Sequence, residues 1–279
     1  MKHQPKQSRL YRRTVLAAVV LGAASRRAMA QAPAVEDPWP SLAAQIFTGR
    51  PLQDGTAIVA IDAPYRAEDA ALVPITLHNL LPADDKRQIR NMTLVIDQNP
   101  SPLAAVFSPG PTSGLRSLST RVRVDSYTNL HAVAELSDGQ LYASARFVKA
   151  AGGCSAPNGK NAVPASLLGK MKFKFEEETI RYNEPVLVQL MIRHPNESPL
   201  AGDFDPSKTP QFVRSVTVTY AGKPVMSAEV DFSISDNPSF RFYFVPYEKG
   251  ELRVEVEDTL DQRYTQTFTV ADDVKLPGE

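Results

Sequence analysis

Apolar and polar residues alternate with a period of two along most of the chain. The clearest runs lie in the second half: MKFKF at 171–175, VTVTY at 216–220, FRFYF at 240–244 and LRVEVE at 252–257. Shorter runs occur earlier, at 94–96, 121–125 and 147–148. Alternation places one apolar face on a core and leaves the other face in water, as half-buried antiparallel strands require. The pattern therefore predicts a protein built mainly from antiparallel strands.

Turn-forming residues separate these runs, as in Asp138-Gly139 and Lys249-Gly250. The stretch 215–230 reads as a β-hairpin, because two alternating runs flank Ala-Gly-Lys. Only 39–48 (WPSLAAQIFT) is a fair helix candidate. Many short strands with Pro-rich and Gly-rich turns favour β-sandwiches over any fold with alternating strands and helices. The sequence predicts an all-β protein with two immunoglobulin-like sandwiches in tandem and a short N-terminal helix.

Composition marks the boundary between the two predicted domains. Residues 150–169 (AAGGCSAPNGKNAVPASLLG) are mostly Ala, Gly, Ser, Asn and Pro, a mixture that cannot build a core and is typical of a flexible linker. The segments on either side, 31–149 and 170–279, each have the size of an immunoglobulin-like sandwich. We therefore expect two domains joined by 150–169.

The first thirty residues have the three-part pattern of a signal peptide: basic residues up to Arg13, an apolar run at 14–24 and Ala-Met-Ala at 28–30. The apolar run is too short to cross a bilayer. Arg12-Arg13 resembles a twin-arginine signal, although the Sec pathway also accepts basic starts. The pattern predicts cleavage after residue 30 and a periplasmic location.

Removal of residues 1–30 would make the chain acidic. The whole sequence has 31 basic and 31 acidic residues, and seven basic residues lie in the predicted signal, which leaves 24 against 31, a net charge near −7. Such a charge argues against nucleic acid or an anionic membrane as a partner.

Cys154 is the only cysteine, so it cannot form a disulfide within the chain or hold a metal cluster that needs several thiolates. It follows Gly152 and Gly153, which widen the freedom of the backbone before it. We expect the thiol to be exposed on a flexible arm, with a pKa near the reference value of about 8.5, and open to thiol–disulfide or sulfur-transfer chemistry. The competing interpretation is an incidental, inert cysteine.

Other candidate sites are weak. His3 would be lost with the signal, and His78, His131 and His194 are scattered without the spacing of metal ligands, so each is more simply a surface or hydrogen-bonded residue. A Cys154–His131 pair stays open at the level of sequence. The acidic residues of the 202–206 segment (GDFDP) lack the spacing of a calcium loop.

Several segments, in both halves of the chain, carry a resemblance to a known family. The run VKAAGGC at 148–154 is similar to the carboxy-terminal arm of SoxY, and 115–125 and 129–134 resemble SoxY strands. The segments that resemble SoxZ are 190–195 (LMIRHP), 212–230, 237–244 (NPSFRFYF) and 250–258. The sequence is thus similar to a SoxY–SoxZ fusion, in particular to the fused carriers associated with quinoprotein dehydrogenases.

This resemblance implies a periplasmic carrier that binds a sulfur compound or related intermediate covalently through Cys154 and performs no turnover alone. It implies no cofactor of its own. Its partners would be periplasmic redox enzymes: Sox-type cytochromes, a sulfur dehydrogenase or sulfohydrolase, or a PQQ-dependent dehydrogenase. The resemblance also implies that the SoxY-like and SoxZ-like domains pack on each other within the chain. One departure is visible, because the SoxY arm normally continues with glycine and ends, whereas here Ser155-Ala156-Pro157 follow and the chain continues.

Two other functions fit the residues. The chain could be a non-covalent docking or chaperone module for a periplasmic dehydrogenase or cytochrome, since alternating strands and an acidic surface suit that function equally well. A thiol reductase or transferase is a third possibility, but such enzymes normally use a second cysteine or an activating base beside the first.

Overall fold

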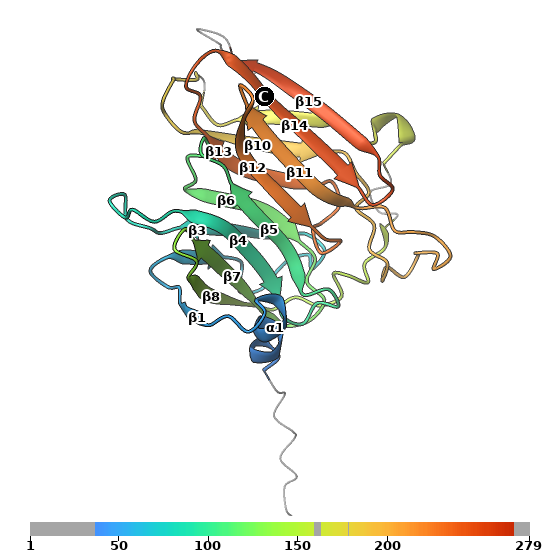
Figure 1. Ribbon diagram of the computed structural model, residues 1–279. Helices are drawn as coiled ribbons and strands as arrows, with labels where there is room; N and C mark the ends of the chain where they lie inside the picture. Colours follow the sequence, from blue (N-terminus) through green and yellow to red (C-terminus); the bar gives the residue numbers. More distant parts are fainter. Residues whose placement is uncertain (1–36, 159–162, 178, 271–279) are drawn as a thin grey trace, which may run out of the picture. The chain divides into compact units, whose positions relative to one another are not determined.

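The computed structural model describes residues 37–158, 163–177 and 179–270. These residues form two sheets of strands, one short α-helix and one 3-10 turn, so the predicted all-β class is confirmed (Figure 1). The predicted signal peptide (1–30) lies outside the described residues. Within them, no helix has the length and apolar character needed to span a bilayer.

The larger sheet contains nine strands, which pair in the order β1 (Leu52–Asp54), β8 (Leu141–Val148), β7 (Thr128–Leu136), β4 (Ile89–Ile96), β5 (Leu103–Pro109), β12 (Lys223–Val230), β11 (Val213–Tyr220), β14 (Gly250–Asp258) and β15 (Arg263–Val270). Only the β1–β8 pair in this sheet is parallel. The predicted hairpin at 215–230 is confirmed as β11 and β12, which turn at Ala221 and Gly222 with positive φ at both residues.

The smaller sheet contains six antiparallel strands, in the order β2 (Val59–Asp62), β3 (Val73–Asn79), β6 (Ser117–Val122), β13 (Ser239–Phe244), β10 (Val186–Ile192) and β9 (Met171–Phe175). A 3-10 turn, η2 (Ala165–Leu167), precedes β9. The predicted period-two run at 240–244 faces the core as expected: in β13 Phe240, Phe242 and Phe244 are buried, and the residues between them are half-buried.

Each sheet contains strands from both halves of the chain. In the larger sheet β5 pairs with β12 from Ala105 opposite Val230 to Pro109 opposite Met226. In the smaller sheet β6 meets β13 at Ser119 and Arg241. The main cluster of buried apolar residues accordingly contains residues from both halves, and in it Phe107 packs edge-on against Phe240 with ring centroids 6.2 Å apart.

The predicted helix at 39–48 is confirmed as α1 (Trp39–Ile46), which lies against β7 and β8 (Figure 1). Ala43 and Phe47 are buried against Val133 and Leu141 on the face of the sheet opposite the main core. Pro38 and Pro40 frame the start of the helix, where the first backbone N–H groups need no helical partner. The domain bounds 31–149, 150–169 and 170–279 remain predictions.

Candidate functional site: the docked cysteine segment

Cys154 lies in a segment that follows β8 and runs beside the residues after β6. The amide of Gly152 donates to the carbonyl of Asp125 at 2.8 Å, and the amide of Gly153 donates to the carbonyl of Val124 at 2.9 Å. These two bonds hold the chain in place just before the cysteine. We call residues 152–158 the docked segment.

The two glycines serve different purposes in this arrangement. Gly152 has φ of +79°, a left-handed conformation that L side chains rarely adopt, and its α-carbon faces open space. Gly153 is buried, and a β-carbon built on it would lie 2.7 Å from the backbone nitrogen of Val124 and closer still to the carbonyl oxygen of Ala70. Those two atoms are themselves hydrogen-bonded to each other at 2.8 Å. Gly153 is therefore needed for a close approach between backbones.

The second half of the chain contributes the other side of the dock, through the loop between β10 and β11 (residues 193–212, the β10–β11 loop). The buried Ser198 hydroxyl donates to the carbonyl oxygen of Cys154 at 2.6 Å. The side chain of Asn158 forms a reciprocal pair with the backbone of Ser198. Its nitrogen Nδ2 donates to the Ser198 carbonyl at 3.0 Å, and its oxygen Oδ1 accepts from the Ser198 amide at 2.8 Å. Two further bonds complete the contact. The backbone amide of Gly202 donates to the carbonyl of Ser155, and the backbone amide of Asn158 donates to the Asp203 carboxylate.

The thiol itself is fully buried, with 0% of the residue's surface exposed. Burial raises the pKa of the Cys154 thiol to about 12; the nearby carboxylates of Asp125 and Asp231 add to the rise, and the Arg123 guanidinium opposes it. A thiol with this pKa is almost entirely protonated at neutral pH, and the protonated form is a poor nucleophile. In the docked position Cys154 is chemically protected.

Arg123 is the buried cation of the site, with 2% of its surface exposed. One guanidinium nitrogen, Nη2, donates to the carbonyl of Asn196 at 2.9 Å, whereas Nε has no hydrogen-bond partner among the described residues. Burial lowers the pKa of Arg123, and the charges of Asp236, Cys154 and Asp69 act in the opposite direction. The side chain thus links the end of β6 to the β10–β11 loop and places a positive charge near the thiol.

The prediction of an exposed thiol with an ordinary pKa is wrong for this structure. Small residues around a cysteine are compatible with a flexible arm, but here they allow the segment to lie close against two other backbone stretches. Polar groups lie near the cysteine: Ser198 bonds its backbone carbonyl, and the charges of Arg123 and Asp125 act on the thiol. The assignment of Cys154 as the covalent carrier residue stays a prediction.

The histidines are placed as hydrogen-bonded residues. His131 on β7 bonds Asp97 at 2.8 Å through Nδ1 and stacks on Trp39 with ring centroids 3.6 Å apart. His194 bonds Asp258 at 3.3 Å, and His78 bonds Asp62 at 2.8 Å. In the described ranges no group of three or more His, Cys, Asp or Glu side chains could hold a metal ion. His3 lies outside the described residues.

A Cys154–His131 pair gains no support. The charged groups that act on the thiol are Asp125, Arg123 and Asp231, and His131 is engaged by Asp97 and Trp39. The residues of the 202–206 segment instead contact the docked segment, through Gly202 and Asp203.

Sequence reasoning missed Ser198, Asn158 and Arg123. Ser198 and Asn158 lie 40 residues apart, so their pairing depends on how the two halves meet. Arg123 occupies a position in an alternating run where a polar residue would normally face water. A buried arginine in such a run has no local signal that distinguishes it from an exposed one.

Comparisons with known proteins match both halves of the chain. A family model described as "Sulfur oxidation protein SoxY" matches residues 43–154, and one described as "Sulphur oxidation protein SoxZ" matches residues 171–269. The chain is a SoxY–SoxZ fusion. The SoxY match ends on Cys154, and the SoxZ match begins at the first residue of β9.

Solved structures similar to parts of the fusion include the sulfur carrier protein SoxY from Chlorobium limicola f thiosulfatophilum. That protein is 29% identical, covers 40% of this chain and 91% of its own, and has a TM-score of 0.33. A β-glycosidase from Bacteroides vulgatus is 8% identical, covers 76% of this chain and 24% of its own, and has a TM-score of 0.21. No curated protein matches the chain significantly.

Proposed function

We propose that this SoxY–SoxZ fusion is a periplasmic carrier that binds a sulfur compound or a related intermediate covalently through Cys154 and presents it to partner enzymes. The observation that carries the proposal is the position of Cys154: it is the only cysteine, the last residue of the SoxY match, and part of a segment held by hydrogen bonds that water can replace. The similar SoxY from Chlorobium limicola is described as a sulfur carrier protein.

The chemistry requires the thiol to leave its buried position. In water, a cysteine thiol has a pKa of about 8.5, so several per cent is thiolate near pH 7.5 and can react. Attachment of thiosulfate would join the thiol sulfur to the terminal sulfur of thiosulfate with release of one proton and two electrons. A partner oxidoreductase, such as a Sox-type cytochrome, must accept those electrons, because a carrier without a cofactor has nowhere to store them.

The partner enzymes are part of the proposal. A sulfur dehydrogenase or sulfohydrolase would fit a thiosulfate pathway, and a PQQ-dependent dehydrogenase would fit the variant role suggested by the resemblance to fused carriers. The periplasmic location rests on the signal-peptide pattern of residues 1–30. An N-terminal mass that begins at Gln31 would support export and cleavage.

Mass spectrometry of the protein purified without reductant tests the carrier function. The expected result is a sulfur-containing adduct on Cys154 under growth conditions in which the partner enzymes are made. A clean thiol under all such conditions contradicts the proposal. Cys154→Ser provides the matched variant, because a hydroxyl of similar size cannot form the adduct.

A second function, a non-covalent docking module, is favoured by one observation: the thiol is fully buried and has a raised pKa. A docking module would keep its biological role after Cys154→Ser, whereas a covalent carrier would lose it. The same strain comparison therefore separates the two functions.

A further inference from the structure

The docked thiol has no space beside it for cargo. None of the surface of Cys154 can be reached by a sphere the size of a water molecule, and the same holds for Val124 and Ser198. A sulfur atom is larger than a water oxygen, and a sulfonate group is larger again. Any group added to the thiol sulfur must therefore displace a neighbour or leave with the segment.

The neighbours of the thiol segment are held firmly. Ser198 and Asn196 both have 0% exposure, and Asn196 bonds the carbonyl of Ile234 at 2.6 Å and the amide of Val213 at 2.8 Å. The β10–β11 loop is thus anchored two residues before Ser198. The docked segment is the weaker partner, because Gly152 and Ser155 are exposed.

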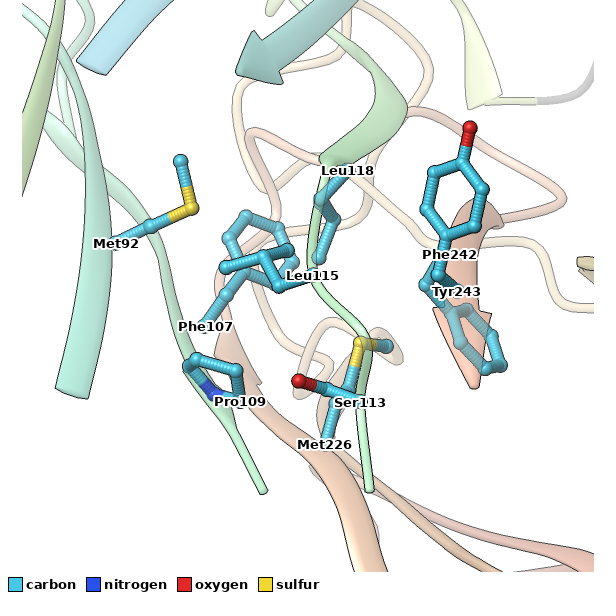
Figure 2. Close-up of a pocket in the computed structure, with 9 residues that line it drawn as sticks. All are labelled: Met92, Phe107, Pro109, Ser113, Leu115, Leu118, Met226, Phe242 and Tyr243. Atoms are coloured by element: carbon cyan, nitrogen blue, oxygen red, sulfur yellow. The ribbon is translucent and has the colours of Figure 1, made fainter. Parts of the chain in front are cut away.

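The apolar cavity between β4, β5, β6, β12 and β13 does not offer an alternative place for cargo. Figure 2 shows its lining, which includes Met92, Phe107, Leu118 and Phe242 and does not include Cys154. Its volume is about 10 Å³, which is close to the minimum for one water molecule. It is too small for a thiosulfonate group.

We propose that the dock accepts only the free thiol, so that attachment of a sulfur group to Cys154 releases residues 152–158 from the β10–β11 loop. This inference rests on the proposed function for its biological meaning. Its physical basis is differential fit: a group that is tolerated only in the released state shifts the population toward that state. The SoxZ half, through Ser198 and its pair with Asn158, then binds the segment when the thiol is free and not when the thiol carries a sulfur group.

As a consequence, partner enzymes would meet the empty and the loaded carrier in different conformations. An empty carrier withdraws its thiol and protects it from adventitious oxidation, whereas a loaded carrier exposes the segment with its cargo. Enzymes that process cargo would then meet mainly loaded carrier. The enzyme that loads the thiol would depend on the small population in which the empty segment is released.

Methyl methanethiosulfonate tests the inference on the full chain without any partner. The reagent converts the thiol to a methyl disulfide, Cys–S–S–CH₃, and the thiol proton leaves with methanesulfinate, so atoms and electrons balance. Intact mass verifies complete modification. Hydrogen–deuterium exchange then follows the amides of Gly152 and Gly153, which are bonded to Asp125 and Val124 in the docked state.

The expected result is a loss of protection of at least tenfold in the peptide that contains residues 152–158, while the strands keep theirs. Unchanged protection of this peptide in the modified protein would overturn the inference. Failure of the thiol to react over hours at pH 8 in native buffer would also overturn it, since loading requires release. Cys154→Ser treated in the same way is the control and should stay protected.

Ser198→Ala offers a second, milder measurement. It removes the hydroxyl that bonds the Cys154 carbonyl and should speed thiol modification about fivefold, which corresponds to about 1 kcal/mol for one hydrogen bond. An unchanged rate would show that the β10–β11 loop does not hold the segment. These outcomes do not depend on finding an adduct in cells, so a failure here and a failure of the carrier function are distinguishable.

Discussion

The substitution Gly153→Ala perturbs the dock at a single carbon atom. The new β-carbon would lie 2.7 Å from the Val124 nitrogen and the Ala70 carbonyl carbon, and nearer still to the Ala70 oxygen. All three are backbone atoms, so the contact cannot be relieved by a side-chain rotation. Because the Val124 amide donates to the Ala70 carbonyl, moving either atom would also break a hydrogen bond.

The docking free energy sets the size of the expected effect. Release of the three residues Gly152 to Cys154 breaks three of the seven hydrogen bonds of the docked segment, from Gly152 to Asp125, from Gly153 to Val124 and from Ser198 to Cys154, each worth about 1 kcal/mol. A total of about 3 kcal/mol leaves these three residues released in roughly one molecule in 150. The overlap in Gly153→Ala exceeds this energy, so the segment should be released in most molecules.

Reaction of the thiol with a chromogenic disulfide at pH 7.5 measures the released fraction. We expect Gly153→Ala to react about 100-fold faster than the unsubstituted chain. Gly152→Ala is the matched control: its β-carbon meets nothing within 4 Å, and only the positive φ of +79° disfavours it, at about 1 kcal/mol. It should react about fivefold faster. Equal rates for Gly153→Ala and the unsubstituted chain would refute the assignment of Gly153 to a close backbone approach.

The pH dependence of docking follows from the same site. The pKa of Cys154 is raised from the ordinary value to about 12 when the thiol is buried. The docked state is therefore fully favoured below pH 8.5, the reference pKa of the released thiol, and loses stability as pH rises from 8.5 toward 12. Amide exchange at Gly153, corrected for intrinsic rates, should show weaker protection at pH 10 than at pH 8; equal protection would contradict the burial of a neutral thiol.

Three further predictions concern other buried residues. Asn196→Ala removes two buried hydrogen bonds and should lower the free energy of unfolding by about 2–4 kcal/mol in urea titrations, whereas an effect below 0.5 kcal/mol would contradict the role of Asn196. Burial lowers the pKa of His194, so the stability of the protein should fall as pH drops below 6.5. In His194→Gln the melting temperature should change less between pH 7 and pH 5 than in the unsubstituted chain, and an equal change would contradict this. His131→Ala removes the ring stacked on Trp39, the only tryptophan, and should change its fluorescence without unfolding the chain; an identical spectrum would contradict the stacking.

The strands were predictable because their signal is local. In the 216–220 run of β11 and in β14 the apolar residues recur at every second position, and these are the residues that the structure buries. The hairpin of β11 and β12 was equally clear, because its turn residues stand directly between two alternating runs. The continuity of each sheet across the two halves was not predictable, since the pairing of β5 with β12 joins strands more than 110 residues apart.

The sequence singles out Cys154 as the candidate residue, but the environment of that cysteine was not predictable. Cysteine counting and the run VKAAGGC at 148–154 single out one residue. The same glycines that indicate freedom also permit close packing, and the choice between the two depends on Ala70, Val124 and Ser198, which are distant in sequence. Composition alone cannot separate a flexible glycine from one that fits against a backbone.

The fusion itself bears on how a buried thiol would perform the proposed carrier function. In a two-subunit carrier the arm ends near its cysteine, whereas here the chain continues past Asn158 into the SoxZ half. Tethering at both ends lowers the entropy of the released segment, which favours return to the dock. Ser198 and Asn158 add contacts that lie beyond the end of the SoxY match. If the empty segment docks strongly, the loaded segment can be presented only if cargo makes docking unfavourable. The absence of space around the buried sulfur has this effect, because a loaded thiol would clash with its neighbours, and no partner is needed.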